Sequence, residues 1–521
     1  MKTFVAASLL SACLFVPSLI RSAPMPALDD HLGKVEFATS CSVAAQPLIE
    51  KGAALLHSFQ YLQSENTFTE AAKQDPKCAM AHWGMAMALY HQLWDFPDKK
   101  RLETGHKELD RAKKQRNISE REKGFLESAS AFFQKNDKMD EKARVAAYSI
   151  AMEKWYASVP GDVEVGSFYA LSLVALAYQE DPAKALELRR KAITVLNSLF
   201  EKNPDHPGVA HYLIHAADEQ SLAPQGLAAA RRYAAIAPDS SHAIHMPSHI
   251  FVRLGMWQDS ITSNLAAQDA GARAAEAHQA ESHYQTHAMD FLNYSYLQSG
   301  QLAKAEAVIA DEHHVVGSNE KSMKEHMDSL NDRMVMELHR WKDAANLTAD
   351  FTFTRTVAAA RSGDLAAARS FLAQLQDEAK KHTGEKKGNY TGASDREISL
   401  HEAEAWVAFV EGKIDVALKT MRAAADAEDS QRLDSFNVRA REMLADMMLE
   451  AKRPTEAFTE YKTALKNSPG RFNLLLGAAR AANGAREFDE AHSYYSKLLE
   501  MCGSSGDRPE LSEARTLTAN N

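Results

Sequence analysis

A glycine followed by an amphipathic stretch recurs along the chain, and this recurrence limits the possible folds most. It is seen in SGQLAKAEAVIA (299–310), SGDLAAARSFLAQL (362–375) and EGKIDVALKTMRAA (411–424). Glycine adopts the left-handed conformation that ends a helix at little cost, so each glycine is expected to separate the two helices of a pair. Alanine is very common, and alternating Val/Ile/Thr patterns are hard to find after residue 40. The sequence therefore predicts an all-α array of antiparallel helix pairs.

The spacing of small and large residues resembles the tetratricopeptide repeat, a unit of about 34 residues that forms two helices. Residues at the characteristic positions of this repeat are Gly52, Ser64, Phe68, Ala71, Pro76, Ala457, Tyr461, Ala464, Pro469, Ala491, Tyr495 and Leu498. The resemblance covers most of residues 33–503. It implies a right-handed α-solenoid whose first helices line a concave groove.

We expect the array to fall into two parts. An N-terminal solenoid with a histidine-rich groove occupies residues 33–379, and C-terminal repeats occupy residues 396–502. The stretch between them, residues 380–395, contains HTGEKKGNYTGASD and predicts a polar loop. Residues 503–521 lack periodic apolar residues and predict a flexible tail.

The charge balance argues against nucleic acid as a partner. The chain has 60 Lys and Arg against 70 Asp and Glu, a net charge of −10, whereas binding to phosphates requires a clustered basic surface. The motifs GxSxG, GxxxxGK[ST] and HExxH are absent. The sequence therefore predicts no nucleophile elbow, phosphate-binding loop or zincin helix.

The first residues, MKTFVAASLLSACLFVPSLIRSAP, have the pattern of a secretory signal. A lysine precedes an apolar run over residues 4–20, and small residues follow it. We expect a signal peptide over residues 1–23 and an exported mature chain, periplasmic or extracellular, without a transmembrane span. Residues 10–13 resemble a lipobox, which leaves a lipidated Cys13 as the alternative.

Three cysteines remain after such a cleavage: Cys41, Cys78 and Cys502. An odd number in an oxidising compartment permits one disulfide and one free thiol. Cys41 and Cys78 flank one helical hairpin and are the expected pair.

Seven histidines lie in helical register within a short part of the chain: His211, His215, His242, His245, His249, His283 and His287. Residues four apart share one face of a helix. On the tetratricopeptide register the first two take positions 5 and 9, the next three take positions 2, 5 and 9, and His287 takes position 2. These positions face the groove, so three successive repeats present imidazoles to one concavity. Pro247 lies inside the second of these helices and is expected to kink it.

Six of the seven are expected to converge on one transition metal, Zn or Cu, namely His211, His215, His242, His245, His249 and His287. We expect His211, His215, His245 and His249 to be the direct ligands, because positions 5 and 9 lie at the centre of the groove. A closed zinc site has four ligands, so the remaining histidines would orient ligands, face a substrate or bind a second ion. Residues expected to orient ligands or to contact a bound molecule are Asp218, Glu219, His283 and Asp290. Packing histidines in a peptide-binding groove are the alternative, and packing is the expectation for His57.

The motifs HYLIH and HAIHMPSHIF are similar to those of a group of exported bacterial tetratricopeptide proteins. This resemblance implies the fold, export and a functional centre within residues 206–290, but no activity. Two functions remain open. One is an exported scaffold whose groove binds a protein, a peptide or a small molecule, with the metal as part of the surface. The other is a metal-dependent hydrolase or oxidoreductase with its site in the groove.

Overall fold

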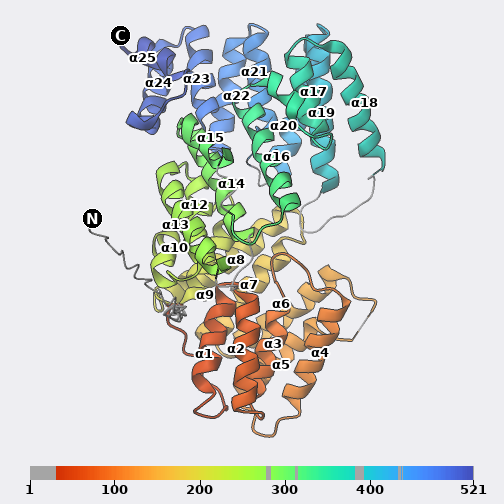
Figure 1. The fold of residues 1–521 in the computed structure, drawn as a ribbon, viewed down its shortest axis with the longest axis vertical. Coiled ribbons are helices and arrows are strands. Elements are labelled where there is room, and N and C mark those ends of the chain that lie inside the picture. Colours follow the sequence, from red (N-terminus) through yellow and green to blue (C-terminus); the bar gives the residue numbers. More distant parts are fainter. Residues whose placement is uncertain are drawn as a thin grey trace, which may run out of the picture. The chain divides into compact units, whose positions relative to one another are not determined.

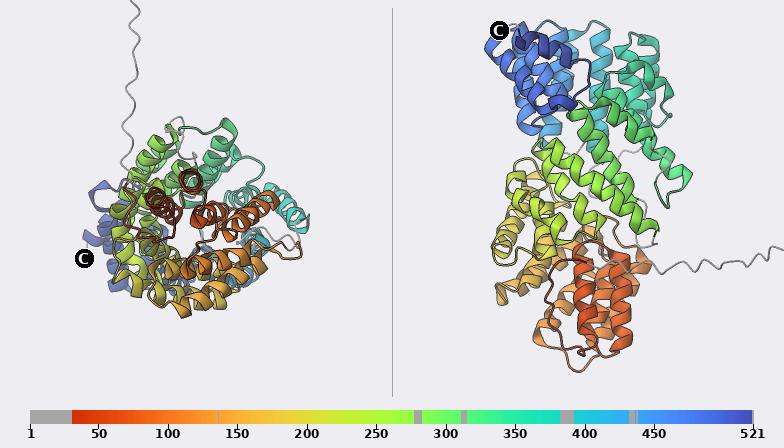
Figure 2. Two further views of the ribbon diagram at one scale, coloured as in Figure 1. Left: turned by 90° about the horizontal axis from the view of Figure 1, so that it is seen from below. Right: turned by 60° about the vertical axis from the view of Figure 1, so that its left-hand side comes forward.

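The structure is a computed structural model that describes residues 31–519 except residues 136, 277–282, 311–314, 382–391, 432–435 and 437. Within these residues the chain consists of helices joined by turns and contains no β-strand (Figure 1). Helices that follow one another in sequence pack side by side, as α1 with α2 and α7 with α8 do (Figure 2). The fold is therefore the all-α solenoid of antiparallel helix pairs that the sequence predicts.

The first eight helices are α1 (Gln46–His57), α2 (Tyr61–Gln74), α3 (Ala79–Ala88), α4 (Lys99–Lys113), α5 (Glu120–Phe132), α6 (Glu141–Ser158), α7 (Val163–Ala177) and α8 (Pro182–Phe200). Many of these helices have a residue with a short polar side chain at the N-terminal cap. The side chains of Asp98, Ser119, Asp140, Asp162 and Asp181 each accept a hydrogen bond from a backbone N–H of the first turn, which satisfies donors that have no partner inside the helix.

Small residues occupy characteristic positions of the repeat because neighbouring helices approach each other closely there. A Cβ atom added at Gly52 would lie 2.9 Å from the ring of Phe68, and one added at Gly84 would lie 2.3 Å from the same ring. Phe68 is fully buried. The large apolar residue of α2 therefore fills the space that glycines leave on α1 and α3.

The middle of the chain contains α9 (Pro207–Ala217), α10 (Ala223–Ile236), α11 (Ser241–His245), α12 (Pro247–Arg253), α13 (Trp257–Glu276), α14 (His283–Gln298), α15 (Leu302–Ala310) and α16 (Glu320–Glu337). Pro247 interrupts the expected helix, which the structure divides into α11 and α12. Proline lacks the backbone N–H that would continue the helix, so this break was predictable.

The C-terminal part contains η2 (Trp341–Asn346), α17 (Thr352–Arg361), α18 (Leu365–Lys381), α19 (Gly392–Val410), α20 (Ile414–Gln431), α21 (Ala440–Glu450), α22 (Pro454–Asn467), α23 (Phe472–Gly484), α24 (Phe488–Cys502), η3 (Gly503–Ser505) and α25 (Leu511–Ala519). Gly300, Gly363 and Gly412 have φ angles of 71°, 81° and 80°. These are the left-handed turns that the sequence predicts between paired helices.

One hydrophobic cluster contains residues from both sides of the expected division near residues 380–395. Most of that stretch lies outside the described residues, but Val357 and Ala368 before it belong to the same buried cluster as Ile398 and Trp406 after it. The boundary of the N-terminal hydrophobic cluster lies elsewhere, because the last buried residue of that cluster is Phe251. A polar connection between two stacked helices does not interrupt the packing of their apolar faces.

Residues 503–519, where the sequence predicts a flexible tail, contain helical segments. This segment forms η3 and α25, and Leu511 and Ala514 of α25 are buried in the C-terminal core. Two apolar residues are too few to show a helical period, and it is packing against α24 that stabilises this helix.

The cysteines are arranged as expected. Cys41 and Cys78, which are separated by 37 positions in the sequence, form a disulfide. Cys502 is free and buried, and burial raises the pKa of its thiol to about 12. No helix among the described residues has both the length and the apolar content that crossing a bilayer requires.

Candidate metal centre

The structure gathers the six candidate ligands into two neighbouring groups of three. The His211 set consists of His211 and His215 from α9 and His242 from α11. The His245 set consists of His245 from α11, His249 from α12 and His287 from α14. In each set, one ring nitrogen of every histidine lies within 4.8 Å of the other two.

In the His211 set the three rings meet through their Nε2 atoms. The Nε2 atom of His211 lies 3.0 Å from that of His215 and 3.1 Å from that of His242. The Nδ1 atom of His211 lies 2.6 Å from the backbone oxygen of His57. A carbonyl oxygen only accepts hydrogen bonds, so Nδ1 carries the proton and the Nε2 lone pair of His211 points at the other two rings.

In the His245 set, hydrogen bonds at Nδ1 orient two of the three rings. His245 donates from Nδ1 to Oδ1 of Asn264 at 2.6 Å, and this amide is oriented because its Nδ2 donates to the backbone oxygen of Ser260 at 2.8 Å. His249 donates from Nδ1 to Oδ2 of Asp218 at 2.9 Å. In the neutral form of each ring both Nε2 atoms are unprotonated, and they face each other at 3.0 Å. Two opposed lone pairs at this distance repel unless a cation lies beside them.

Burial disfavours a proton on five of the six histidines. Burial lowers the pKa of His211 and of His287 to about 3, and it lowers the pKa values of His215, His242 and His245 well below their ordinary value. Desolvation penalises the charged imidazolium, and neighbouring histidines add to the penalty. These five rings are neutral at neutral pH, which is the form that binds metals.

Asp218 contacts the His245 set through the Nδ1 atom of His249, on the side of the ring away from the other histidines. Burial raises the pKa of its carboxyl group, but the charge of Arg253 outweighs this effect and holds the pKa well below its ordinary value. One oxygen accepts from His249, and the other accepts from Nε of Arg253 at 3.0 Å. A carboxylate on the far nitrogen of an imidazole fixes the ring and makes it a stronger ligand.

A phenylalanine ring covers each set. Phe59 lies 4.4 Å from His211 and 5.4 Å from His215 between ring centroids, and Phe291 lies 4.6 Å from His245 and 4.8 Å from His249. Phe59 has a φ angle of 56°, which is unfavourable for a residue with a side chain. Surrounding contacts maintain this strain, and the result is an apolar cover over the His211 set.

A third group of possible ligands, His57, Glu164 and His206, is internally satisfied. Nδ1 of His206 accepts from the backbone N–H of Val209, so its Nε2 carries the proton and donates to Glu164 at 2.8 Å. His57 contacts the other oxygen of Glu164 at 2.7 Å and the hydroxyl of Tyr212 at 2.9 Å. No nitrogen of His206 is left for a metal. This buried network instead holds the residue whose backbone oxygen orients His211.

The grouping differs from the expected set of direct ligands. We expected His211, His215, His245 and His249 to share one ion, but His242 joins the first two and His287 joins the last two. The reason is tertiary, because each group takes its third histidine from the next helix pair.

Three of the expected supporting residues lie elsewhere. Glu219 accepts a hydrogen bond from the backbone N–H of Ser221, and His283 is exposed with its ring against Tyr284. Asp290 pairs with Arg333. Helix α9 ends at Ala217, so residues 218 and 219 do not continue the helical face on which the expectation rested.

Sequence reasoning missed the residues that orient and cover the sets. These are Asn264, Phe59, Phe291 and the backbone oxygen of His57. No local pattern marks them, since His57 and His211 are separated by 154 residues.

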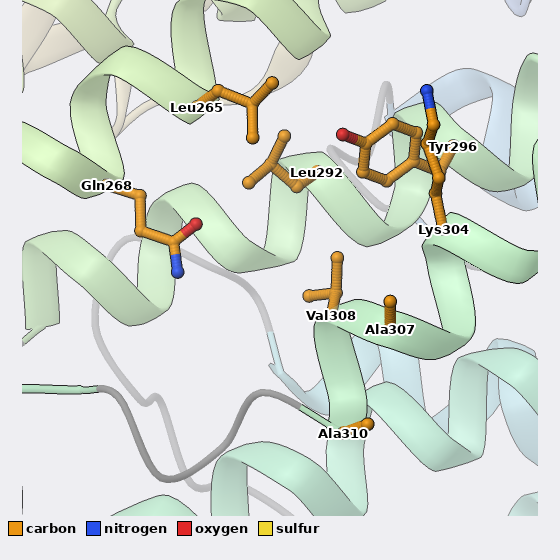
Figure 3. Close-up of a pocket in the computed structure, with 8 residues that line it drawn as sticks. All are labelled: Leu265, Gln268, Leu292, Tyr296, Lys304, Ala307, Val308 and Ala310. Atoms are coloured by element: carbon orange, nitrogen blue, oxygen red, sulfur yellow. The ribbon is translucent and has the colours of Figure 1, made fainter.

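A separate cavity of about 400 Å³ opens between α13, α14 and α15 (Figure 3). Leu265 and Gln268 line it from α13, Leu292 and Tyr296 from α14, and Val308 from α15. None of the six histidines lines it. It is an open, mixed surface with no convergent set of polar groups, unlike the histidine sets.

Comparison with known proteins identifies one matching family, described as tetratricopeptide repeat, over residues 402–472. No curated protein matches the chain. Among solved structures, yeast Tom70 is 12% identical, with 90% of this chain and 87% of that chain covered and a TM-score of 0.28. The human IFIT1 dimer with m7Gppp-AAAA is 13% identical, with 90% and 92% covered and a TM-score of 0.36. The P58(IPK) TPR domain is 13% identical, with 92% and 99% covered and a TM-score of 0.20.

These TM-scores are low, so no property of those proteins is transferred to this chain. The comparisons therefore identify residues 402–472 as tetratricopeptide repeat sequence, within a chain that is helical throughout its described residues.

Proposed function

We propose that this helical-repeat protein binds transition-metal ions, Zn or Cu, through the histidines of the His211 and His245 sets. The observation that carries the proposal is that the Nε2 atoms of His245 and His249 face each other at 3.0 Å, while a contact from each Nδ1 to an oxygen fixes both rings. A metal ion placed beside both Nε2 atoms would be coordinated by both.

The donor set suits these metals. Neutral imidazole nitrogen binds Zn, Cu, Fe and Ni, and Cu²⁺ and Zn²⁺ stand at the strong end of the affinity order for such ligands. Imidazole–zinc distances are about 2.0–2.1 Å, so two ligand nitrogens of one ion lie near the 3.0–3.1 Å spacings seen within each set. The orienting contacts of His211, His245 and His249 complete the pattern of a metal site.

Elemental analysis of protein without a histidine tag, loaded with Zn(II) or Cu(II) and then dialysed, tests the proposal. The wild type is expected to retain metal. The His211→Ala/His249→Ala variant removes one ligand from each set and is expected to bind at least about 100-fold more weakly, because loss of an outer partner alone costs about 10–100-fold.

His31→Ala/His106→Ala is the matched control, since both histidines lie outside the two sets. It should retain as much metal as the wild type. Circular dichroism checks that each variant is helical. A wild type that neither contains metal nor gains thermal stability from added Zn(II) or Cu(II) would contradict the proposal without any variant.

Partner binding is the broader part of the proposed function. An array of tetratricopeptide-type helix pairs presents a concave surface suited to a protein, a peptide or a small molecule, and the metal centre would form part of that surface.

A metal-dependent enzyme is the second candidate, and one observation favours it. Each set supplies three histidines, and catalytic zinc sites keep three protein ligands and one open position. Azide added to the Cu(II)-loaded protein is expected to shift the visible absorption by occupying that position. A spectrum that azide leaves unchanged would favour the binding role over catalysis.

Export is also part of the proposal. The predicted signal lies outside the described residues, and the support comes from the Cys41–Cys78 disulfide, since such bonds persist in oxidising compartments. Mass spectrometry of the mature N-terminus is expected to find a start between residues 19 and 24. A lipid on Cys13, or an intact residue 1, would overturn this cleavage.

A further inference from the structure

We propose that the two histidine sets are copies of one three-histidine site and that they bind two metal ions side by side, as a dinuclear centre. This inference rests on the proposed metal binding and adds the number of ions, their relation to each other and the class of ligand that they share.

The spacing between equivalent histidines of the two sets equals the repeat period. His245 follows His211 by 34 residues, and His249 follows His215 by 34 residues, which is the length of one tetratricopeptide repeat. These pairs occupy positions 5 and 9 of successive repeats.

The third histidine of each set also lies at an equivalent repeat position. His242 and His287 both occupy position 2 of the repeat that follows their set. Each set is therefore built from positions 5 and 9 of one repeat and position 2 of the next. Stacking of identical units repeats any site that lies across the boundary between them.

The two sites adjoin. Within the sets, the closest ring centroids are 4.5–5.0 Å apart. Across the sets, His215 lies 6.4 Å from His249, and His242 lies 6.4 Å from His245. The six rings thus lie next to one another, so two ions bound by the two sets would be neighbours, as in two-metal sites, which have separations of about 3.5–4 Å.

The charges around the six histidines indicate which kind of ligand the two ions share. The imidazoles supply no negative charge, and the carboxylate of Asp218 is paired with Arg253. Two divalent ions therefore bring positive charge that the surrounding residues offset poorly. A small oxygen anion such as hydroxide, bridging both ions, offsets this charge and fills the open position of each.

Titration with Cu(II), followed by elemental analysis and electron paramagnetic resonance, tests the inference. The wild type is expected to bind two copper ions per chain. Two Cu(II) ions that share a bridging ligand couple their unpaired electrons, so the integrated signal should fall below the total copper.

Variants that damage one set separate the two sites. His215→Ala in the His211 set and His287→Ala in the His245 set should each leave one copper ion with a full, uncoupled signal. The His31→Ala/His106→Ala control should keep two coupled ions. If either variant fails to fold, the stoichiometry and the coupling of the wild type decide the matter.

The outcomes distinguish this inference from the proposed function. One copper ion per wild-type chain overturns the dinuclear centre and leaves the proposed metal binding intact. Two ions with full, uncoupled signals also overturn it. A wild type that binds no metal overturns both.

Discussion

Replacing Arg471 with alanine is expected to lower the free energy of unfolding by about 3–5 kcal/mol, because the change leaves two carboxylates buried without their cation. Arg471 is 1% exposed and lies just before α23. It donates to Glu442 at 2.9 Å, to Glu337 at 2.7 Å and to the hydroxyl of Tyr294 at 3.0 Å. One side chain therefore ties α23 to α14, α16 and α21, and chemical denaturation of the purified protein measures the loss.

A surface pair provides the control for this prediction. Arg480 is 42% exposed and pairs with Glu513, and Arg480→Ala should cost no more than about 1 kcal/mol. Adding Glu337→Gln and Glu442→Gln to Arg471→Ala should restore part of the stability, since the buried charges are then gone. Equal losses for Arg471→Ala and Arg480→Ala would show that burial of the Arg471 contacts has no energetic consequence.

The metal-free protein is expected to lose stability as the pH falls from 6.5 to 5. The pKa of His211 is about 3 in the folded state because of burial, against 6.5 for the free side chain. Between these values the unfolded chain binds more protons than the folded chain, so stability is complete above pH 6.5 and declines as the pH falls toward 3. At pH 5 this amounts to about 2 kcal/mol for His211 alone, and the other buried histidines act in the same direction.

Thermal unfolding of chelator-treated protein at pH 7, 6 and 5 measures this effect, in a range where ordinary carboxylates stay ionised. The His287→Asn variant is the control, because it removes one histidine whose pKa burial lowers. Its melting temperature should depend less steeply on pH. A wild-type melting temperature that stays constant from pH 7 to pH 5 would contradict the prediction.

The break at Pro247 shows where sequence reasoning succeeds. Proline ends a helix through its own missing N–H, and glycines such as Gly300 end helices through their own freedom of φ. These are local causes. The histidine spacings are local in the same sense, since residues four apart on a helix must share a face.

The ligand grouping shows where that reasoning stops. Spacing places His215 and His249 at equivalent positions of neighbouring repeats, but it does not say which ring each will meet. The structure pairs His215 with His211 and His242, while His249 faces His245. The position of each third histidine depends on how successive helix pairs stack, and stacking is set by side-chain packing between repeats.

The sequence by itself determined the helical repeats, the positions of their turns, the Cys41–Cys78 pairing and the common face of the histidines. Each of these follows from short-range geometry or from the repeat period. Only the tertiary structure decided that the histidines form two sets, that Asp218 serves His249 after α9 ends, and that Phe59 and the backbone oxygen of His57 complete the site. These contacts join residues far apart in the chain, and no local periodicity encodes them.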